Sequence, residues 1–569
     1  MKCLRANLLL FLLSMSAQPV LSQTINHPGY FYDNYITGVS FHTTMAMIAE
    51  NDFLILNQKN GKVRRFIDGV FVSDVLDLPV AGGNHRGLIG ICLDPDFNLN
   101  GRVYLFYSYA LQDNGAWIEN RVERFIWNGA TLTSDMILLT IPYDPDQNNS
   151  EIMQGGILGI GPDKKLYVSV GCLGRGTFDN PRIEQNTGET NVAGAGAIYR
   201  LNLDGTIPSD NPFVGENNHY LRAIYVYGLR NCFGHTFDPL TGRFWMTENG
   251  PEVYDEINTF LPGANSGWRK IMGPDYRNAQ FFDNNYTSYN ASDLVYLPGA
   301  HYQDPVFSVL PTSGFTSITF IHSHKYSAPL RDSALVGESV GLRLYLYELT
   351  ENRDDFVLEG PLADRVADTD EEKNLNQFGI GWGVVTDIKI GPDGYLYVLS
   401  YTEGKVYRIR PLNDLVLAKE MLVTVGQLLS GSVEKTHYTD NQYVKLRARV
   451  GRGGEIAAQM QLSSSAPPPT SVKTLNELVF KTSVKTSKIL IQEIHLYNNN
   501  TSEWELVSTS LTSASDKVTT LTINSDISRF VNPTTGEVKA QISWKALASA
   551  IGFPPEINVD EATWTFKYN

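Results

Sequence analysis

The chain alternates short apolar runs with polar turns, and one such pattern occurs almost unchanged at two distant places. Residues 159–171 are GIGPDKKLYVSVG and residues 389–401 are KIGPDGYLYVLSY. In each segment an apolar strand end meets a Gly-Pro-Asp turn, after which bulky residues alternate with smaller or polar ones. This alternation predicts a β-hairpin with one buried face. A hairpin repeated at a long interval indicates a repeated β architecture.

Related patterns occur elsewhere, so the chain contains six predicted hairpins. They begin at Ile48, Leu93, Ile160, Phe237, Leu330 and Ile390. Over residues 26–411 each unit takes about 64 residues, which is enough for four short strands and a loop. Four-stranded units arranged around an axis cover each other's faces and protect their edges. The pattern therefore predicts an all-β chain with a six-bladed β-propeller over residues 26–411, and the alternative is a pair of stacked β-sandwiches.

The pattern changes after Arg410. The Pro- and Ser-rich segment SSSAPPPTS (463–471) predicts a loop, and segments such as KILIQEIHLYN (488–498) predict half-buried strands. Residues 418–569 are therefore predicted to form a separate β-sandwich of unknown role, because their length is typical of one domain. Its aromatic residues Tyr497, Trp504 and Trp544 could form a sugar-stacking surface or could belong to the core.

Composition narrows the class of protein further. The chain has 569 residues, of which 48 are Gly and 29 are Tyr, and a composition rich in Gly and aromatic residues favours strands and tight turns. The formal net charge is −15, and no run of Lys and Arg occurs. A nucleic-acid partner is therefore not expected, because such binding needs a concentrated basic face.

The first residues resemble a targeting segment. Lys2 and Arg5 precede an apolar stretch, and small residues before Gln23 provide a cleavage site. We expect a signal peptide over residues 1–22 and a secreted protein, extracellular or periplasmic; the alternative is an N-terminal membrane anchor, although the apolar stretch is short for a span. No later segment is expected to span a membrane. Three cysteines remain after cleavage, so the fold is not a disulfide scaffold.

An ordered series of motifs resembles the glucose/sorbosone dehydrogenase family. The motifs are RGLIGICLDPDF (86–97), GAIYRLNLDGTIPSDNPF (196–213), YGLRNCFGHTFDPLTGRFWMTENGP (227–251), DEIN (255–258), PGANSGW (262–268) and VTDIKIGPDGYLYVLS (385–400). The resemblance implies a secreted six-bladed propeller that binds pyrroloquinoline quinone and calcium. It also implies oxidation of an aldose at its anomeric carbon, with transfer of electrons to an external acceptor.

The resemblance assigns roles to particular residues. Met153 occupies the position of the family's catalytic His, and a thioether cannot accept a proton near neutral pH. His85 is a candidate cofactor contact and a substitute base. Arg230 and Asn231 match the family's cofactor-binding pattern, and the alternative for Arg230 is a bridge between loops. The implied calcium ligands are backbone oxygens and carboxylates at Asn249, Gly250, Pro251, Asp255 and Glu256.

Three other positions differ from the family pattern. Val340, Val384 and Thr386 stand where the best-studied branch has Lys or Arg contacts to the quinone. Two hypotheses follow from these residues. The protein is either a quinone-dependent aldose dehydrogenase or a propeller that has lost catalysis and binds a glycan or a protein partner.

Overall fold

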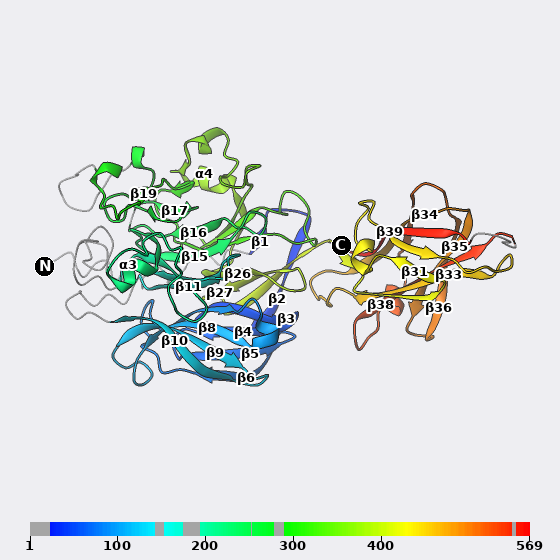
Figure 1. Ribbon diagram of the computed structural model, residues 1–569, viewed down its shortest axis with the longest axis horizontal. Coiled ribbons are helices and arrows are strands. Elements are labelled where there is room, and N and C mark those ends of the chain that lie inside the picture. Colours follow the sequence, from blue (N-terminus) through cyan, green and yellow to red (C-terminus); the bar gives the residue numbers. More distant parts are fainter. Residues whose placement is uncertain (1–22, 143–152, 174–193, 252, 278–288, 549–553) are drawn as a thin grey trace. The chain divides into compact units, whose positions relative to one another are not determined.

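The chain divides into two compact units. The computed structural model describes residues 23–142, 153–173, 194–251, 253–277, 289–548 and 554–569. The first unit comprises Asn34–Ile409 with the described residues up to Pro28, and the second comprises Gly29–Asp33 with Arg410–Asn569. Figure 1 shows strands throughout both units. The expected signal peptide lies outside the described residues. None of the described helices has the length and apolar character needed to cross a membrane.

Six sheets account for the strands that precede Asn413. The first sheet contains β3 (His42–Ala49), β4 (Asp52–Asn57), β5 (Lys62–Ile67) and β6 (Val70–Asp77). The second contains β7 (Leu88–Leu93), β8 (Arg102–Tyr109), β9 (Glu119–Trp127) and β10 (Leu132–Pro142). The third contains β11 (Gly155–Ile160), β12 (Leu166–Val170), β13 (Ala197–Leu201), β14 (Ile224–Tyr227), β18 (Ala264–Asn265) and β19 (His301–Tyr302). The fourth sheet contains β15 (Cys232–Phe237), β16 (Phe244–Glu248), β17 (Asp255–Asn258), β20 (Phe307–Val309) and β24 (Val366–Ala367). The fifth contains β21 (Phe315–Phe320), β22 (Ala334–Glu338), β23 (Arg343–Tyr347), β25 (Gln377–Ile380) and β1 (Thr24–Ile25). The sixth contains β26 (Val385–Ile390), β27 (Leu396–Ser400), β28 (Lys405–Pro411) and β2 (Tyr30–Thr37).

The first strands of these sheets lie around one axis. In the order β3, β7, β11, β15, β21, β26, each strand contacts the next, and β26 contacts β3 again. One cavity of about 10 Å³ lies between them and is lined by residues of all six strands. Because this volume holds at most about one water molecule, side chains fill the axis. The all-β propeller fold predicted from the sequence is confirmed, and two stacked sandwiches would not give this cyclic order.

Short helices lie in the connections, and most belong to the first unit. The α-helices are α2 (Phe97–Asn100), α3 (His219–Ala223) and α4 (Asp370–Leu375). The 3₁₀ helices are η1 (Asp275–Arg277), η2 (Ala291–Asp293), η3 (Gly360–Asp364), η4 (Val433–Thr436) and η5 (Ile527–Phe530). The predicted hairpin at Leu93 therefore contains a helical turn between β7 and β8.

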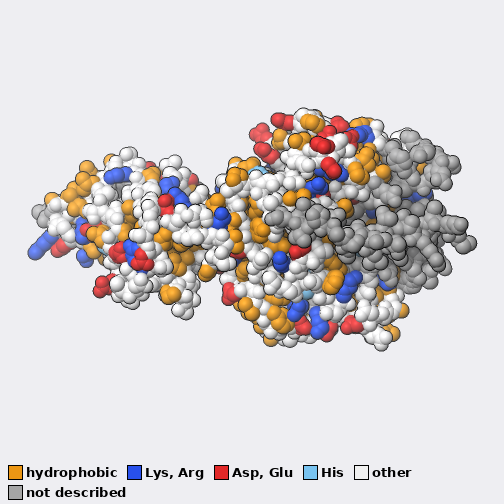
Figure 2. All heavy atoms as spheres, turned by 180° about the vertical axis from the view of Figure 1, so that it is seen from behind, with side chains coloured by type: hydrophobic (Ala, Val, Ile, Leu, Met, Phe, Trp, Pro, Cys, Tyr) orange, Lys and Arg blue, Asp and Glu red, His pale blue; other side chains and the backbone are white. Residues whose placement is uncertain are grey.

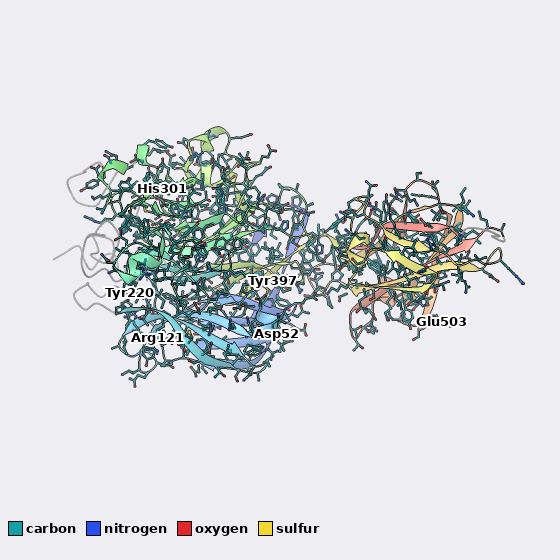
Figure 3. All side chains as sticks on the ribbon, in the orientation of Figure 1. Asp52, Arg121, Tyr220, His301, Tyr397 and Glu503 are labelled. Carbon is teal, nitrogen blue, oxygen red and sulfur yellow. The ribbon has the colours of Figure 1, made fainter. Side chains whose placement is uncertain are left out.

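The repeated Gly-Pro-Asp turn joins two strands through one side chain. Asp393 accepts hydrogen bonds from the Tyr395 backbone N–H at 3.1 Å and from the Tyr397 hydroxyl at 2.7 Å. Asp163 makes the same pair of contacts with the Lys165 N–H and the Tyr167 hydroxyl. The phrase recurs because in both of these sheets one Asp side chain ties the turn to the second strand; Tyr397 is labelled in Figure 3.

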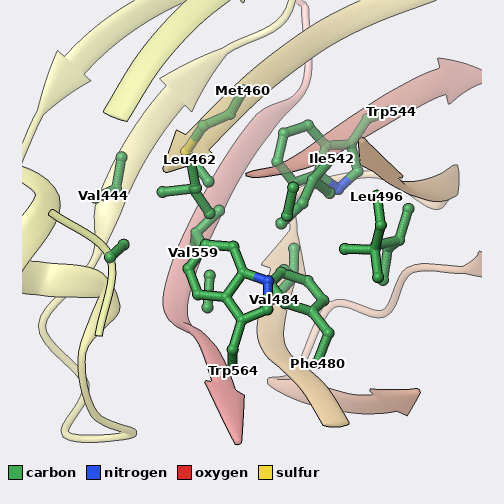
Figure 4. Close-up of a cluster of buried hydrophobic side chains, with 14 of the residues drawn as sticks. Val444, Met460, Leu462, Phe480, Val484, Leu496, Ile542, Trp544, Val559 and Trp564 are labelled. Carbon is green, nitrogen blue, oxygen red and sulfur yellow. The ribbon is translucent and has the colours of Figure 1, made fainter. Parts of the chain in front are cut away.

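The second unit contains two sheets that share one hydrophobic core. One contains β31 (Gln427–Ser430), β32 (Val444–Arg447), β39 (Glu556–Tyr568), β34 (Leu475–Thr486) and β37 (Lys517–Ile523), with β29 (Asn413–Leu417) paired to β39. The other contains β30 (Glu420–Val425), β33 (Ile456–Ser465), β38 (Glu537–Ala546), β35 (Leu490–Asn498) and β36 (Glu503–Leu511). Side chains from both sheets form the core in Figure 4, where Trp564 packs against Phe480 and Trp544 comes from the other sheet.

One of the three aromatic candidates of this unit is a core residue. Trp544 is fully buried, and its indole N–H donates to the Gln492 side-chain oxygen at 3.0 Å. The expectation that Trp544 could belong to an exposed surface is therefore wrong, because its position on β38 faces the core. Tyr497 and Trp504 are only half-buried and lie on the opposite side of the same sheet.

Candidate ligand site

The predicted site residues of the first unit meet beyond one end of β11, β12 and β15. The Cys172 N–H donates to the Arg230 carbonyl at 2.8 Å, and the Leu173 N–H donates to the Met153 carbonyl at 3.1 Å. The Asn249 N–H donates to the Asn231 carbonyl at 3.0 Å. These backbone bonds place segments from three parts of the sequence side by side.

Asn231 fixes the loops of this site to one another. Its side-chain oxygen accepts the Gly155 N–H at 3.1 Å, and its NH₂ group donates to the Asn249 side-chain oxygen at 3.2 Å. The Asn249 NH₂ group in turn donates to the Phe315 carbonyl at 2.6 Å. Both ends of the buried Asn231 side chain are therefore used within the protein, which favours a structural role over cofactor contact.

Arg230 is directed at the oxygens that were expected to bind calcium. Its Nη1 donates to the Asn249 carbonyl at 2.8 Å and to the Gly250 carbonyl at 2.7 Å. The residue is only 5% exposed, and its guanidinium lies 5.4 Å from the centre of the Trp268 ring, within the range of a cation–π contact. A cationic side chain thus occupies the position at which two carbonyl dipoles converge.

The two carboxylates expected near calcium bind amides instead. Asp255 is fully buried and accepts the backbone N–H groups of Gly250 at 3.0 Å, of Ser313 at 2.7 Å, of Phe315 at 3.3 Å and of Gly314. Glu256 accepts the Asn258 NH₂ group at 2.9 Å and the Gly273 N–H at 2.5 Å.

These contacts correct the expected calcium site. The lone pairs of Asp255 and Glu256 are directed at amide donors, and the Asn249 and Gly250 carbonyls are directed at Arg230. No cluster of three or more His, Cys, Asp or Glu that could hold a metal occurs among residues 23–569 outside the gaps given above. Pro251, the fifth expected ligand residue, is half-buried beside them. The described residues do not fit a calcium ion.

A buried pair of carboxyl groups lies on the two strands next to the loop of Asn249 and Gly250, and this pairing was not predicted from the sequence. Glu248 and Glu256 are directly opposite each other on β16 and β17. Glu248 accepts the Arg230 N–H at 2.6 Å and the Ser266 hydroxyl at 2.9 Å, and burial raises its pKa to about 7. Burial and the nearby Glu248 charge raise the pKa of Glu256 well above its ordinary value. The sequence could have indicated it through Glu248, a charged residue at the end of the mostly apolar strand segment FWMTE (244–248).

Met153 has the apolar surroundings of a core residue. It is 9% exposed, and it packs in a buried cluster with Cys172, Tyr254, Trp268 and Met272. Its backbone has φ of 58°, a conformation uncommon for residues other than Gly. No proton acceptor is supplied by the Met153 side chain.

His85 is the nearest candidate for the missing base. Its Nδ1 accepts the Met153 backbone N–H at 3.3 Å, so the proton of the neutral ring lies on Nε2. Burial, together with the charges of Arg230 and Lys59, lowers the pKa of His85 to about 4. The ring nitrogen that could accept a proton is therefore already engaged, which contradicts the expectation that His85 substitutes for the lost base.

The family described as Glucose / Sorbosone dehydrogenase matches residues 41–408. The chain belongs to this family. The match covers the first unit and leaves the second unit outside it.

Relatives with named activities occur among the similar proteins. Quinoprotein glucose dehydrogenase B of Acinetobacter calcoaceticus is 31% identical over 242 residues, covering 40% of this chain and 47% of the relative. Aldose sugar dehydrogenase YliI of Escherichia coli is 25% identical over 375 residues, covering 65% of this chain and 90% of the relative. An oxidoreductase structure from Thermus thermophilus, described as a glucose dehydrogenase, has a TM-score of 0.51 at 23% identity; it covers 67% of this chain and 100% of its own.

Val340, Val384 and Thr386, where the resemblance implies cationic contacts to the quinone, are neutral residues with other surroundings. The Thr386 hydroxyl donates to the His42 carbonyl at 3.1 Å, and Thr386 lines the cavity on the axis. The Val384 N–H donates to the Thr402 hydroxyl at 2.9 Å, and Val340 is exposed. Lys59, the cation beside His85, donates to the Gly83 carbonyl. A quinone with several carboxylates needs cationic partners, so these residues do not fit it.

Proposed function

We propose that this glucose/sorbosone dehydrogenase family member binds a carbohydrate at the site around Arg230 without oxidising it. Two relatives are named for glucose and for aldose sugars, which supports carbohydrate as the class of ligand. A protein partner is the other ligand that a propeller without catalysis could bind.

The main support for this proposal is the position of the Arg230 guanidinium. Because Arg230 Nη1 bonds to the Asn249 and Gly250 carbonyls, a divalent cation at the same oxygens would meet a positive charge. Without the cation and without the Lys and Arg contacts at Val340, Val384 and Thr386, pyrroloquinoline quinone has little to bind. These residues therefore support no oxidative step.

The second candidate function is quinone-dependent oxidation of an aldose at its anomeric carbon, with an external electron acceptor. Membership of the family favours it, as does the position of Arg230 and Asn231 beside Met153. This oxidation would require the Arg230 side chain to move away from the Asn249 and Gly250 carbonyls. It would also require a group other than Met153 or His85 to accept the proton of the sugar hydroxyl.

Quinone titration separates the two candidates. The purified protein is mixed with pyrroloquinoline quinone and calcium, and dye reduction is followed with a panel of aldoses. We expect no saturable quinone binding and no dye reduction, either for the natural chain or for Met153→His. Dye reduction by the natural chain would contradict the proposal and establish the dehydrogenase.

Carbohydrate binding is tested separately by saturation-transfer NMR with the same aldoses and their short oligomers. We expect a signal with the natural chain that is lost in Arg230→Met. Tyr438→Ala serves as the control, because Tyr438 is exposed on the second unit; the comparison is repeated in a Trp504→Ala background, which removes an aromatic sugar contact of that unit. Absence of any signal, or a signal that survives Arg230→Met, contradicts a carbohydrate site on the propeller.

The ends and domains of the chain enter the proposal as well. We propose that residues 1–22 are removed as a signal peptide, that the protein is secreted, and that a propeller over residues 26–411 precedes a β-sandwich over residues 418–569. N-terminal sequencing of the exported protein should begin at Gln23, and an intact N-terminus would contradict the cleavage.

A further inference from the structure

We infer that the outer face of the sheet β30-β33-β38-β35-β36 binds a neutral polysaccharide chain. This inference concerns the second unit alone and does not depend on the proposed function of the propeller. It rests on the side chains that alternate with the core residues of these five strands, since alternate residues of a strand face opposite sides.

An aromatic pair lies at one edge of this face. Tyr497 on β35 is paired with Trp504 on β36, and their rings meet edge to face at 5.3 Å. Both rings are half-buried, so their free surface faces solvent while their position is fixed. The Lys539 ammonium lies 5.5 Å from the Tyr497 ring. A fixed aromatic ring offers the C–H face of a sugar a large contact area at a small cost in conformational entropy.

Side-chain amides continue from the aromatic pair across the sheet. The Gln461 NH₂ group donates to the Gln541 oxygen at 2.9 Å, and the Gln459 NH₂ group donates to the Ser543 hydroxyl at 2.9 Å. The Thr424 hydroxyl donates to the Gln459 oxygen at 2.7 Å. These bonds hold the amides in one orientation before a ligand arrives, which reduces the entropic cost of binding.

Two of these amides keep groups available for a ligand. Within the part of the chain that the structure describes, no hydrogen bond engages the Gln461 oxygen or the Gln541 NH₂ group; Gln461 is half-buried and Gln541 is 8% exposed. An acceptor and a donor therefore lie next to each other on adjacent strands. Vicinal hydroxyls of a sugar supply the matching donor and acceptor.

Most charges on this face are paired with one another, whereas Glu420 on β30 accepts the Ser463 hydroxyl at 3.1 Å. Lys545 lies 2.7 Å from Glu493, and Lys539 lies 2.8 Å from Glu537. Burial lowers the pKa of His495, so this ring is neutral at neutral pH. Figure 2 likewise shows acidic and basic side chains mixed over the visible side of this unit. A face whose charges nearly balance, with one extra carboxylate at Glu420, complements an uncharged ligand and gives no attraction to a polyanion.

The shape of the face selects a chain over a single sugar. A row of five paired strands is an open surface, whereas single small ligands are usually held in concave pockets. A polysaccharide lying across the strands would contact Trp504 and Tyr497 with one unit and Gln541 and Gln461 with the next ones. Weak contacts with several units then add together.

Sedimentation with insoluble polysaccharides tests this inference on the full-length protein. The probes are cellulose, chitin, xylan and a β-1,3-glucan, with alginate as an anionic comparison in affinity electrophoresis. We expect binding to at least one neutral polysaccharide. We also expect Trp504→Ala and Gln541→Leu each to weaken binding by at least about ten-fold, because each removes one fixed contact.

Tyr438→Ala is the matched control, because Tyr438 is an exposed aromatic residue outside this sheet face and its loss should leave binding unchanged. Circular dichroism verifies the fold of each variant, and Gln461→Leu replaces any variant that fails to fold. The inference is wrong if the natural chain binds none of the neutral polysaccharides, binds alginate equally well, or binds as before after Trp504→Ala.

Discussion

At the scale of single residues, Arg230 decides what the loop at Asn249 and Gly250 can bind. Its Nη1 satisfies both carbonyls, so the loop needs no metal for its stability. We predict that the melting temperature of the natural chain changes by less than about 1 °C on addition of calcium or a chelator. Differential scanning fluorimetry measures this directly, and a clear fall with the chelator would contradict it.

Removal of the Arg230 side chain should expose the same oxygens. In Arg230→Ala the two carbonyls lose a charged donor, which costs about 1.5–3 kcal/mol for each buried hydrogen bond to a charged group. We predict a lower melting temperature that calcium, a cation that binds carbonyl oxygens, partly restores. Met272→Ala is the control, because it destabilises the same cluster without freeing a carbonyl. Equal calcium responses in the two variants would contradict the assignment.

The residues of this loop were predictable from sequence, but their partners were not. The motifs GLRN and TENGP placed Arg230 beside Asn249 and Gly250, and the structure brings them together. Whether those oxygens face a metal or a guanidinium depends on the rotamer of one side chain and on the direction of two carbonyls. Spacing along the chain does not determine either of them.

At the scale of elements, the turn between β26 and β27 explains why the phrase Gly-Pro-Asp is repeated. A Cβ at Gly391 would lie 2.5 Å from the Asp393 Oδ1 and 2.7 Å from the Tyr397 ring. We predict that Gly391→Ala lowers the free energy of unfolding by about 1–3 kcal/mol, because the ring and the carboxylate must move apart. Urea unfolding measures the change. Gly215→Ala is the control, since nothing lies near its Cβ position, and an equal loss there would contradict the argument.

The opposed carboxyls on β16 and β17 should make stability depend on pH. The pKa of Glu256 is raised in the folded protein by burial and by Glu248, so its protonated form stabilises the fold below the ordinary pKa of the carboxyl. That contribution is lost as pH rises through the raised pKa. We predict that Glu256→Gln, which is neutral at every pH, is more stable than the natural chain by at least about 1 kcal/mol at pH 8. The difference should shrink toward pH 4.5.

The geometry around Glu256 permits this substitution. The Gln oxygen can still accept the Gly273 N–H. Its NH₂ group can donate to the Asn258 side-chain oxygen, which is buried without a partner among the described residues, once the Asn258 amide turns over to present that oxygen. Chemical denaturation across this pH range gives the comparison. Glu503→Gln is the control, because Glu503 is exposed at the start of β36, as Figure 3 shows. A stability difference that does not vary with pH would contradict the role of proton binding.

At the scale of the whole molecule, the hairpin period predicts neighbouring strands within the sheets, but it does not predict the outer strands that complete two of them. The six predicted hairpins all contribute neighbouring strands to sheets. The outer strands β1 and β2 come instead from the start of the chain and complete the sheets of β25 and β28. A local period cannot show such a closure, because the paired residues are more than 350 positions apart, as Thr24 and Ile380 are.

The second unit likewise includes a segment from the start of the chain, and Arg410 binds it. The fully buried Arg410 lies 3.5 Å from Asp33, donates to the Pro468 carbonyl at 2.8 Å and donates to the Tyr568 hydroxyl at 2.9 Å. All of these residues belong to the second unit. One guanidinium therefore joins the early segment, the Pro-rich loop and the last strand.

Arg410→Met should reveal whether the two units unfold separately. Loss of one partner from a buried ion pair costs about 3–5 kcal/mol, and it should lower the melting temperature of the second unit by about 6–20 °C. We predict two calorimetric transitions, of which only the one assigned to the second unit moves. Arg410→Lys should move it less, because Lys keeps the charge but lacks the fork that reaches three partners. A single transition that shifts as a whole would mean that the units unfold together, since a bond within one unit would then stabilise both.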